Sequence, residues 1–78
     1  MRPSDERFSV YQFFPDGSYE QVCHYVGPME ASRRAVNLTM SVGAQVGTTV
    51  RVIITDSGDS INWEWEFGKG VVYPPKES

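Results

Sequence analysis

The run from Ile61 to Phe67 constrains the fold more than any other stretch, because apolar and polar residues alternate along it without interruption. Successive side chains of a β-strand point to opposite faces of the sheet. Ile61, Trp63, Trp65 and Phe67 therefore share one face, and the polar residues between them share the other. Aromatic side chains bury more area than any others, and both tryptophans of the protein lie on this face. We predict a strand here that anchors the core.

A hairpin is predicted in the first third of the chain. Residues 8–14 and 19–26 are rich in aromatic and β-branched side chains, and Pro15-Asp16-Gly17-Ser18 separates them. Proline suits the first central position of a turn, aspartate suits the second, and glycine accepts a positive φ. This order indicates a type I turn followed by a glycine bulge, which joins two antiparallel strands.

Both faces of this hairpin are expected to be largely apolar. The turn places Tyr11 opposite Gln21 and Val10 opposite Val22. The even-numbered positions then form one face: Phe8, Val10, Gln12, Phe14, Glu20, Val22, His24 and Val26. The odd-numbered positions form the other: Ser9, Tyr11, Phe13, Tyr19, Gln21, Cys23 and Tyr25. A sheet with one covered and one solvated face alternates more cleanly, so a helix on either face leaves apolar side chains outside.

A helix is predicted from Pro28 to Val46, because proline is favoured at the first helical position and Gly47 is placed for a C-terminal cap. At about 100° per residue, one apolar stripe is assigned to the sheet: Ala31, Ala35, Leu38, Val42 and Val46. A second, narrower stripe lies nearly opposite: Met29, Val36 and Met40. A helix that packs on one sheet alone does not need this second stripe.

A second hairpin is predicted from a strand over residues 48–55 and the alternating strand described first. We expect Val52 opposite Trp63, and Arg51 across from Glu64 on the other face. A slip of one residue would place Arg51 among the tryptophans, which favours the chosen register.

The predicted fold class is α+β, a β-β-α-β-β chain with a four-stranded, mostly antiparallel sheet and one helix packed on one face. We expect the sheet order 2-1-3-4. Gly68-Lys69-Gly70 interrupts the last strand, and residues 71–73 continue it after a bulge or pair with another chain. Residues 1–78 are predicted to form a single domain, with 1–6 and 74–78 as disordered or extended tails.

Size and charge limit the classes of function. A chain of 78 residues buries only roughly 60–65% of its unfolded surface, and its single cysteine cannot form an internal disulfide. Oligomerisation is the remaining way to enlarge the core. The net charge of −3 and the pI near 4.9 argue against nucleic acid or an anionic membrane as partner. With a free thiol and no apolar run of membrane-spanning length, we expect a cytoplasmic protein.

No residue pattern indicates catalysis or ligand binding. Cys23 and His24 are neighbours on a strand, so their side chains are expected on opposite faces, as a buried thiol and a surface imidazole. The segment Asp56–Asp59 is better explained as a hairpin turn than as a metal loop. Gly68-Lys69-Gly70 lacks the spacing of a phosphate loop. We predict no catalytic residue, no cofactor, no metal and no small-molecule ligand, and therefore a protein that is not an enzyme.

The prediction that remains is a protein interface, because tyrosine and phenylalanine are enriched at interfaces and contiguous apolar patches are rare on monomers. The candidate interface residues are Tyr11, Phe13, Tyr19, Tyr25, Met29, Val36 and Met40. We expect a non-catalytic interaction module that forms a homodimer or docks on another protein. The alternatives are that strand twist and the terminal segments cover the patch, that an aromatic sheet face binds single-stranded nucleic acid, or that an enzyme site assembles across a dimer.

Two segments resemble small uncharacterised proteobacterial proteins of the hairpin–helix–hairpin type: residues 8–19, FSVYQFFPDGSY, and residues 63–70, WEWEFGKG. The resemblance extends over most of the chain, and its motifs are structural rather than catalytic. It implies the same fold in a bacterial protein, and it implies no activity, since such families carry none.

Overall fold

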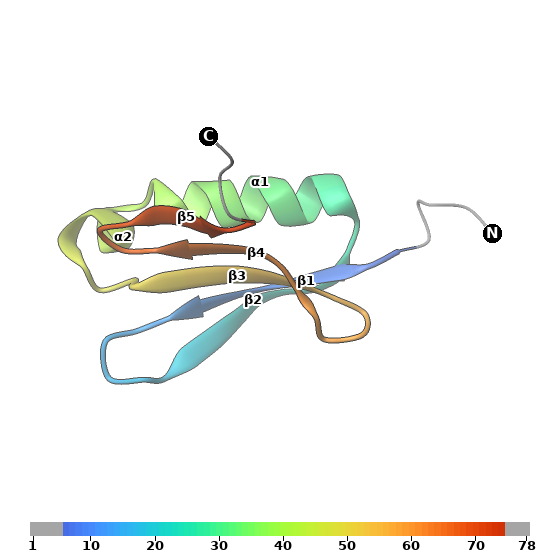
Figure 1. Cartoon of the computed structure of the whole chain (residues 1–78), viewed down its shortest axis with the longest axis horizontal. Helices are drawn as coiled ribbons and strands as arrows, with labels where there is room; N and C mark the ends of the chain where they lie inside the picture. The colour runs from blue at the N-terminus through green and yellow to red at the C-terminus, as the bar shows by residue number, and fades with distance from the viewer. Residues whose placement is uncertain (1–5, 75–78) are drawn as a thin grey trace.

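The computed structural model describes residues 6–74, which form a five-stranded antiparallel sheet with two helices on one face (Figure 1). The elements in chain order are β1 (Phe8–Phe13), β2 (Tyr19–Val26), α1 (Pro28–Thr39), α2 (Val42–Val46), β3 (Arg51–Asp56), β4 (Ile61–Glu66) and β5 (Gly70–Tyr73). The α+β class is confirmed. The predicted tails fall mostly on residues 1–5 and 75–78, outside the described residues.

The strand order is β2-β1-β3-β4-β5, so the predicted order of the first four strands is confirmed and a fifth strand is added. The prediction of four strands was wrong because Gly68 and Gly70 do more than interrupt a strand. Both have positive φ, at 83° each, which only glycine adopts without strain. They turn the chain back, and β5 pairs antiparallel with β4.

The turn of the first hairpin forms as predicted. Gly17 has a φ of 91°, and the Phe14 N–H donates to the Ser18 carbonyl at 2.9 Å. Asp16 Oδ1 accepts from the Ser18 hydroxyl at 2.6 Å and from the Ser18 N–H at 2.9 Å. These bonds lower the pKa of the Asp16 carboxyl below its ordinary value. The turn is therefore fixed by its own residues, which is why the sequence revealed it.

The register beyond the turn is correct at Tyr11, which faces Gln21, and wrong at Val10, which faces Cys23 instead of Val22. The pairing shifts between Val10 and Tyr11, which is the mark of a β-bulge. The bulge moves Cys23 from the face that it was predicted to share with Tyr11 to the face of Val10, where its thiol is buried. A simple odd–even rule cannot anticipate this, because an extra residue moves the positions after it to the opposite face. A second register shift, between Phe8 and Val10, restores the alternation and pairs Phe8 with Val26.

The predicted long helix is two helices. Ser41 has extended backbone angles, and its hydroxyl donates to the Leu38 carbonyl at 2.7 Å and accepts from the Ala44 N–H at 3.2 Å. Ser41 therefore bonds to a carbonyl in the last turn of α1 and serves as the N-cap of α2. Two residues assigned to the sheet stripe, Val42 and Val46, are consequently 74% and 66% exposed, so that assignment was wrong.

The C-terminal cap of α2 is confirmed, since Gly47 has a φ of 90°. Gly43 is required by close packing: a Cβ there would lie 3.0 Å from the hydroxyls of Thr48 and Thr49. Its carbonyl accepts from the N–H groups of Gly47, Thr48 and Thr49 at 3.0, 2.9 and 3.0 Å. Hydrogen bonds to the Gly43 carbonyl therefore hold the bend between α2 and β3.

The pairing of β3 with β4 is shifted by two residues from the prediction, so that Val52 faces Trp65 rather than Trp63. An even shift leaves every side chain on its predicted face. Arg51 therefore still lies on the face of Glu64, and its Nε donates to Glu64 Oε2 at 2.7 Å. The register then shifts at the start of β4, so Ile61 pairs with Thr55 and leaves the face it was predicted to share with Trp63.

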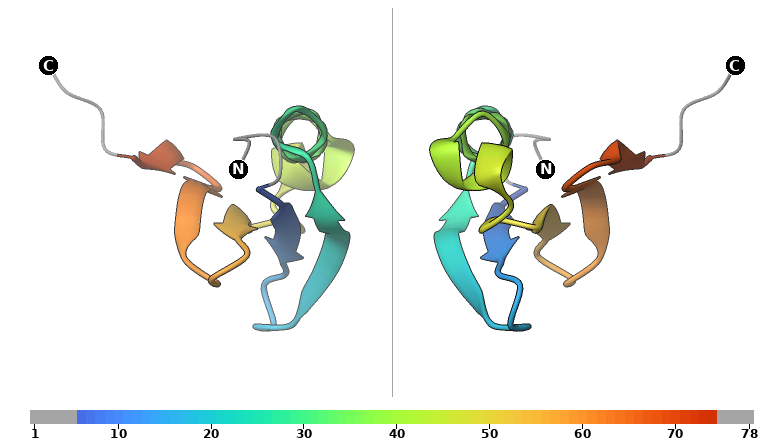
Figure 2. Two further views of the ribbon diagram at one scale, coloured as in Figure 1. Left: turned by 90° about the vertical axis from the view of Figure 1, so that its right-hand side faces the viewer. Right: turned by 90° about the vertical axis from the view of Figure 1, so that its left-hand side faces the viewer.

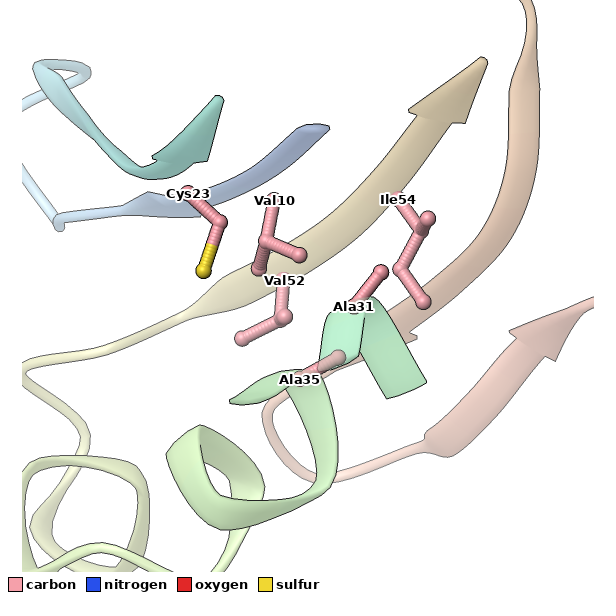
Figure 3. Close-up of a cluster of buried hydrophobic side chains, with 6 residues drawn as sticks. All are labelled: Val10, Cys23, Ala31, Ala35, Val52 and Ile54. Carbon is pink, nitrogen blue, oxygen red and sulfur yellow. The ribbon is translucent and has the colours of Figure 1, made fainter. Parts of the chain in front are cut away.

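The core lies between α1 and the central strands β1 and β3, and its side chains are small (Figure 3). Its buried members are Val10, Cys23, Ala31, Ala35, Val52 and Ile54. The largest side chains that are fully buried are the two valines. Trp63 and Trp65 only border this cluster and are partly buried, so β4 flanks the core rather than anchoring it.

Candidate functional site

The helices cover only part of the sheet. α1 packs mainly on β1, β2 and β3. Figure 2 shows α1 end-on above β1 and β2, while β4 and β5 rise beside it on the other side of β3. The small residues Ala31 and Ala35 face the sheet and let α1 approach it closely. The helix-side surface of β4 and β5 is thereby left without a covering element among residues 6–74.

A groove of about 340 Å³ runs between α1 and β4. Ala35 and Val36 form its helix wall, Phe8 and Ile54 its floor, and Asn62 and Trp63 its far wall. The bulge at the start of β4 contributes here, because it turns Asn62, which was predicted on the opposite face from Trp63, toward the groove. The groove joins residues from four elements, and no pattern within one element predicts it.

The predicted second stripe of α1 is exposed. Met29 is 83%, Val36 46% and Met40 67% accessible to solvent. We name these three residues the helix stripe. Val36 also lines the groove, so the stripe and the groove form one continuous apolar surface.

Charged residues border the helix stripe and are already paired. Glu30 accepts from Arg33 at 2.8 Å and from Arg34 at 3.0 Å. The bonds from Arg34 and Arg33 lower the pKa of the Glu30 carboxyl. These cations therefore leave the apolar character of the stripe intact.

The far side of the sheet carries a second group of candidates, Tyr11, Phe13 and Tyr19, which we name the open sheet face together with Arg51 and Glu64. The Tyr19 ring centroid lies 5.9 Å from that of Tyr11 and 5.4 Å from that of Phe13. The Arg51 guanidinium lies 4.9 Å from the Phe13 ring centroid. Tyr11 and Phe13 are half-buried.

The ion pair at the edge of this face is well shielded, since the Glu64 side chain is only 15% exposed. The hydrogen bond from Arg51 lowers the pKa of the Glu64 carboxyl, and partial burial opposes the effect. The arrangement holds one guanidinium between an aromatic ring and a carboxylate. These contacts stabilise the pairing of β3 with β4, and they leave the Arg51 guanidinium bound to side chains of its own chain.

Tyr25 joins the open sheet face through its neighbours. Its ring stacks on His24 at 4.3 Å and 9°, and Gln21 Nε2 lies 3.1 Å from His24 Nδ1 and 3.0 Å from the Tyr11 hydroxyl. Tyr25 has a φ of 55°, a conformation in which a large side chain is strained. The seven candidates thus divide between two opposite sides of the molecule, four on the sheet side and three on the helix stripe.

The segments considered for chemistry have structural roles. Cys23 is buried and His24 is exposed, as predicted. Asp56 closes a turn by accepting from the N–H groups of Gly58 and Ser60 at 2.9 and 3.0 Å. Between residues 6 and 74, no three His, Cys, Asp or Glu side chains gather as a metal site would require. No helix in this part of the chain is long and apolar enough to cross a membrane.

The comparisons with known proteins found no match to this chain among family models, curated proteins or solved structures. The resemblance to proteobacterial hairpin–helix–hairpin proteins therefore stays a prediction.

Proposed function

We propose that this chain is a non-catalytic interaction module of the cytoplasm that self-associates as a homodimer. The observation that supports this proposal is a mismatch between what the fold buries and what it exposes. The fully buried side chains are valines and alanines, whereas several larger apolar side chains remain more than 45% exposed: Met29, Met40, Phe67, Tyr19 and Tyr25.

This mismatch has a physical cost for a monomer. Each Å² of apolar surface removed from water contributes about 25 cal/mol, and a small domain has little stability to spare. Contiguous apolar surface on a soluble protein therefore usually has an occupant. A second protein that covers one of the two apolar sides would supply the burial that the small core does not.

The structure does not favour the nucleic-acid alternative. That function requires cations gathered around the aromatic sheet face. Arg33 and Arg34 lie on α1 on the other side of the sheet, and Arg51 is committed to Glu64 and Phe13. The nearby acidic side chain of Glu64 would repel a phosphate backbone.

The solution mass tests the proposal. We expect light scattering on a sizing column to give twice 8.8 kDa at high concentration, with dissociation on about hundredfold dilution. A titration with mixed single-stranded oligonucleotides at low salt serves as the control for the alternative. A mass of 8.8 kDa at every concentration would refute self-association.

A further inference from the structure

We infer that the homodimer forms on the helix side, with the helix stripe of each copy seated in the groove of the other. This inference rests on the proposed self-association and specifies its surface and geometry. The result is a layered dimer in which two α1 helices lie side by side between two sheets.

The helix α1 has two apolar sides. Ala31 and Ala35 are each 1% exposed against their own sheet. Met29, Val36 and Met40 lie nearly opposite them at about 100° per residue. A helix placed between two sheets requires this pattern, and a helix on the surface of a monomer does not.

The sheet also has a part beside α1 that no helix of the described residues covers. The groove lies between α1 and β4, and Figure 2 shows β4 and β5 on the other side of β3 from β1. The helix-side residues of this part of the sheet include Trp63 in the groove and Val71, which pairs with Trp65 and is 47% exposed. Phe67, also 47% exposed, packs against Gly47 at one end of this surface.

The helix stripe and the groove are also self-complementary. A convex apolar stripe and a concave apolar groove lie side by side on one chain and share Val36. A two-fold axis between two copies places each stripe on the other copy's groove, which is the isologous contact of a C2 dimer. A second copy therefore fits both features at once, whereas an unrelated helix would fill the groove and leave the stripe exposed.

Charge and area are compatible with this contact. Arg33 and Arg34 are already paired with Glu30, and the groove presents only the small polar groups of Ser32 and Asn62. No unpaired charge would be buried. The exposed parts of Met29, Val36, Met40, Phe67 and Val71 amount to about 500 Å², taking up to about 200 Å² for a large exposed side chain. With the groove walls added, this approaches the roughly 800 Å² per partner of a standard interface.

The open sheet face is the competing surface, and it supplies the matched control. Val36→Glu places a carboxylate at the centre of the inferred contact, and Tyr19→Glu places one on the opposite side of the molecule. Both side chains are exposed in the monomer, at 46% and 62%, so both variants are expected to fold. We expect Val36→Glu to weaken dimerisation about 100-fold or more, because the charge would be buried without a partner, and Tyr19→Glu to leave it unchanged.

Two measurements separate the outcomes. Sedimentation equilibrium of the wild type and both variants gives the dissociation constants, and circular dichroism confirms that each variant is folded. Met40→Glu, at a position that is 67% exposed, is a second variant with the same expected effect. In addition, the tryptophan emission of the wild type should shift to the red on dilution, because dissociation uncovers Trp63. The midpoint of this shift should coincide with the midpoint of the change in mass, and Trp63→Phe should reduce the shift.

The failures of the two proposals are distinguishable. If the wild type is a dimer and Val36→Glu does not weaken it, the helix-side geometry is wrong but self-association still holds. The same conclusion follows if Tyr19→Glu dissociates the dimer. A wild type that is monomeric at every concentration would overturn both. A dimer that only the helix-side variants dissociate is the result we expect.

Discussion

Replacing Val52 by alanine tests how the core is built. Val52 lies on β3 between α1 and the tryptophans of β4, and it is 0% exposed. The matched control is Val42→Ala, since Val42 has the same side chain and is 74% exposed. The amphipathic pattern of the sequence predicts that both valines face the sheet, so the pair also tests the break between α1 and α2.

The expected cost at Val52 follows from what the substitution removes. Losing two carbon atoms forfeits about 1.6 kcal/mol of transfer free energy at about 0.8 kcal/mol per buried methylene. The cavity that remains adds about 1 kcal/mol, because the rigid strand and helix around it relax only partly. We therefore expect a loss of about 2–3 kcal/mol from a total stability of about 4–12 kcal/mol for a chain of this length. Val42→Ala should change stability by less than about 0.5 kcal/mol, since alanine also favours the helix.

Urea unfolding followed by tryptophan fluorescence measures both changes. The midpoint should fall for Val52→Ala with an unchanged slope, which shows that the unfolding transition itself is the same. Both variants are compared at a concentration below the dimer dissociation constant, so that association does not contribute. A loss at Val42 equal to that at Val52 would refute the helix break and the position of the core.

Two further predictions concern local interactions. Ser41→Ala removes the N-cap of α2 and the bond to the Leu38 carbonyl, so we expect a loss of about 1 kcal/mol in urea unfolding. The control Gln45→Ala, at an exposed position of α2, should have little effect, and a stabilising Ser41→Ala would indicate one continuous helix. Stability should decrease as the pH falls below the ordinary Glu64 pKa of 4.5, because a carboxyl whose pKa is lower in the folded state loses its contribution as it becomes protonated. Thermal melts should show a smaller acid loss for Glu64→Gln than for the wild type, and an unchanged acid loss would mean that the Arg51 ion pair contributes nothing.

The two candidate surfaces differ in what they can offer a partner. On the open sheet face, Tyr11 bonds to Gln21 and packs on Tyr19, and Phe13 holds Arg51. These side chains already have partners in their own chain. Met29 and Met40 on the helix stripe are among the most exposed large apolar residues of the described chain. Flexible methionine side chains adapt to an opposing surface, which suits the stripe to a contact between copies.

Much of the candidate site could be predicted one residue at a time. The second apolar stripe of the helix follows from helical periodicity, and the common face of Tyr11 and Phe13 follows from strand alternation. Alternation did not predict that this face points away from α1. The groove could not be predicted, because it depends on where α1 lies across the sheet and on a bulge that turns Asn62 inward. The groove forms only where residues from β1, α1, β3 and β4 come together. The only sequence signal for it was that Ala31 and Ala35 allow the helix to pack closely on a few strands.

The sequence by itself determined the features that adjacent residues control. The turn at Asp16 and Gly17, the cap at Gly47 and the identity of the first four strands follow from local backbone preferences and from alternation. The order of these four strands was expected because it lets β3 run antiparallel to β1. The face of Arg51 was also determined, because only even shifts keep its charge away from the tryptophans. Tertiary structure decided the rest: the bulge that buried Cys23, the break at Ser41 that exposed Val42, and the return of β5 onto β4. The physical reason is that these choices differ little in local energy, so the packing of distant elements against a small core selects among them.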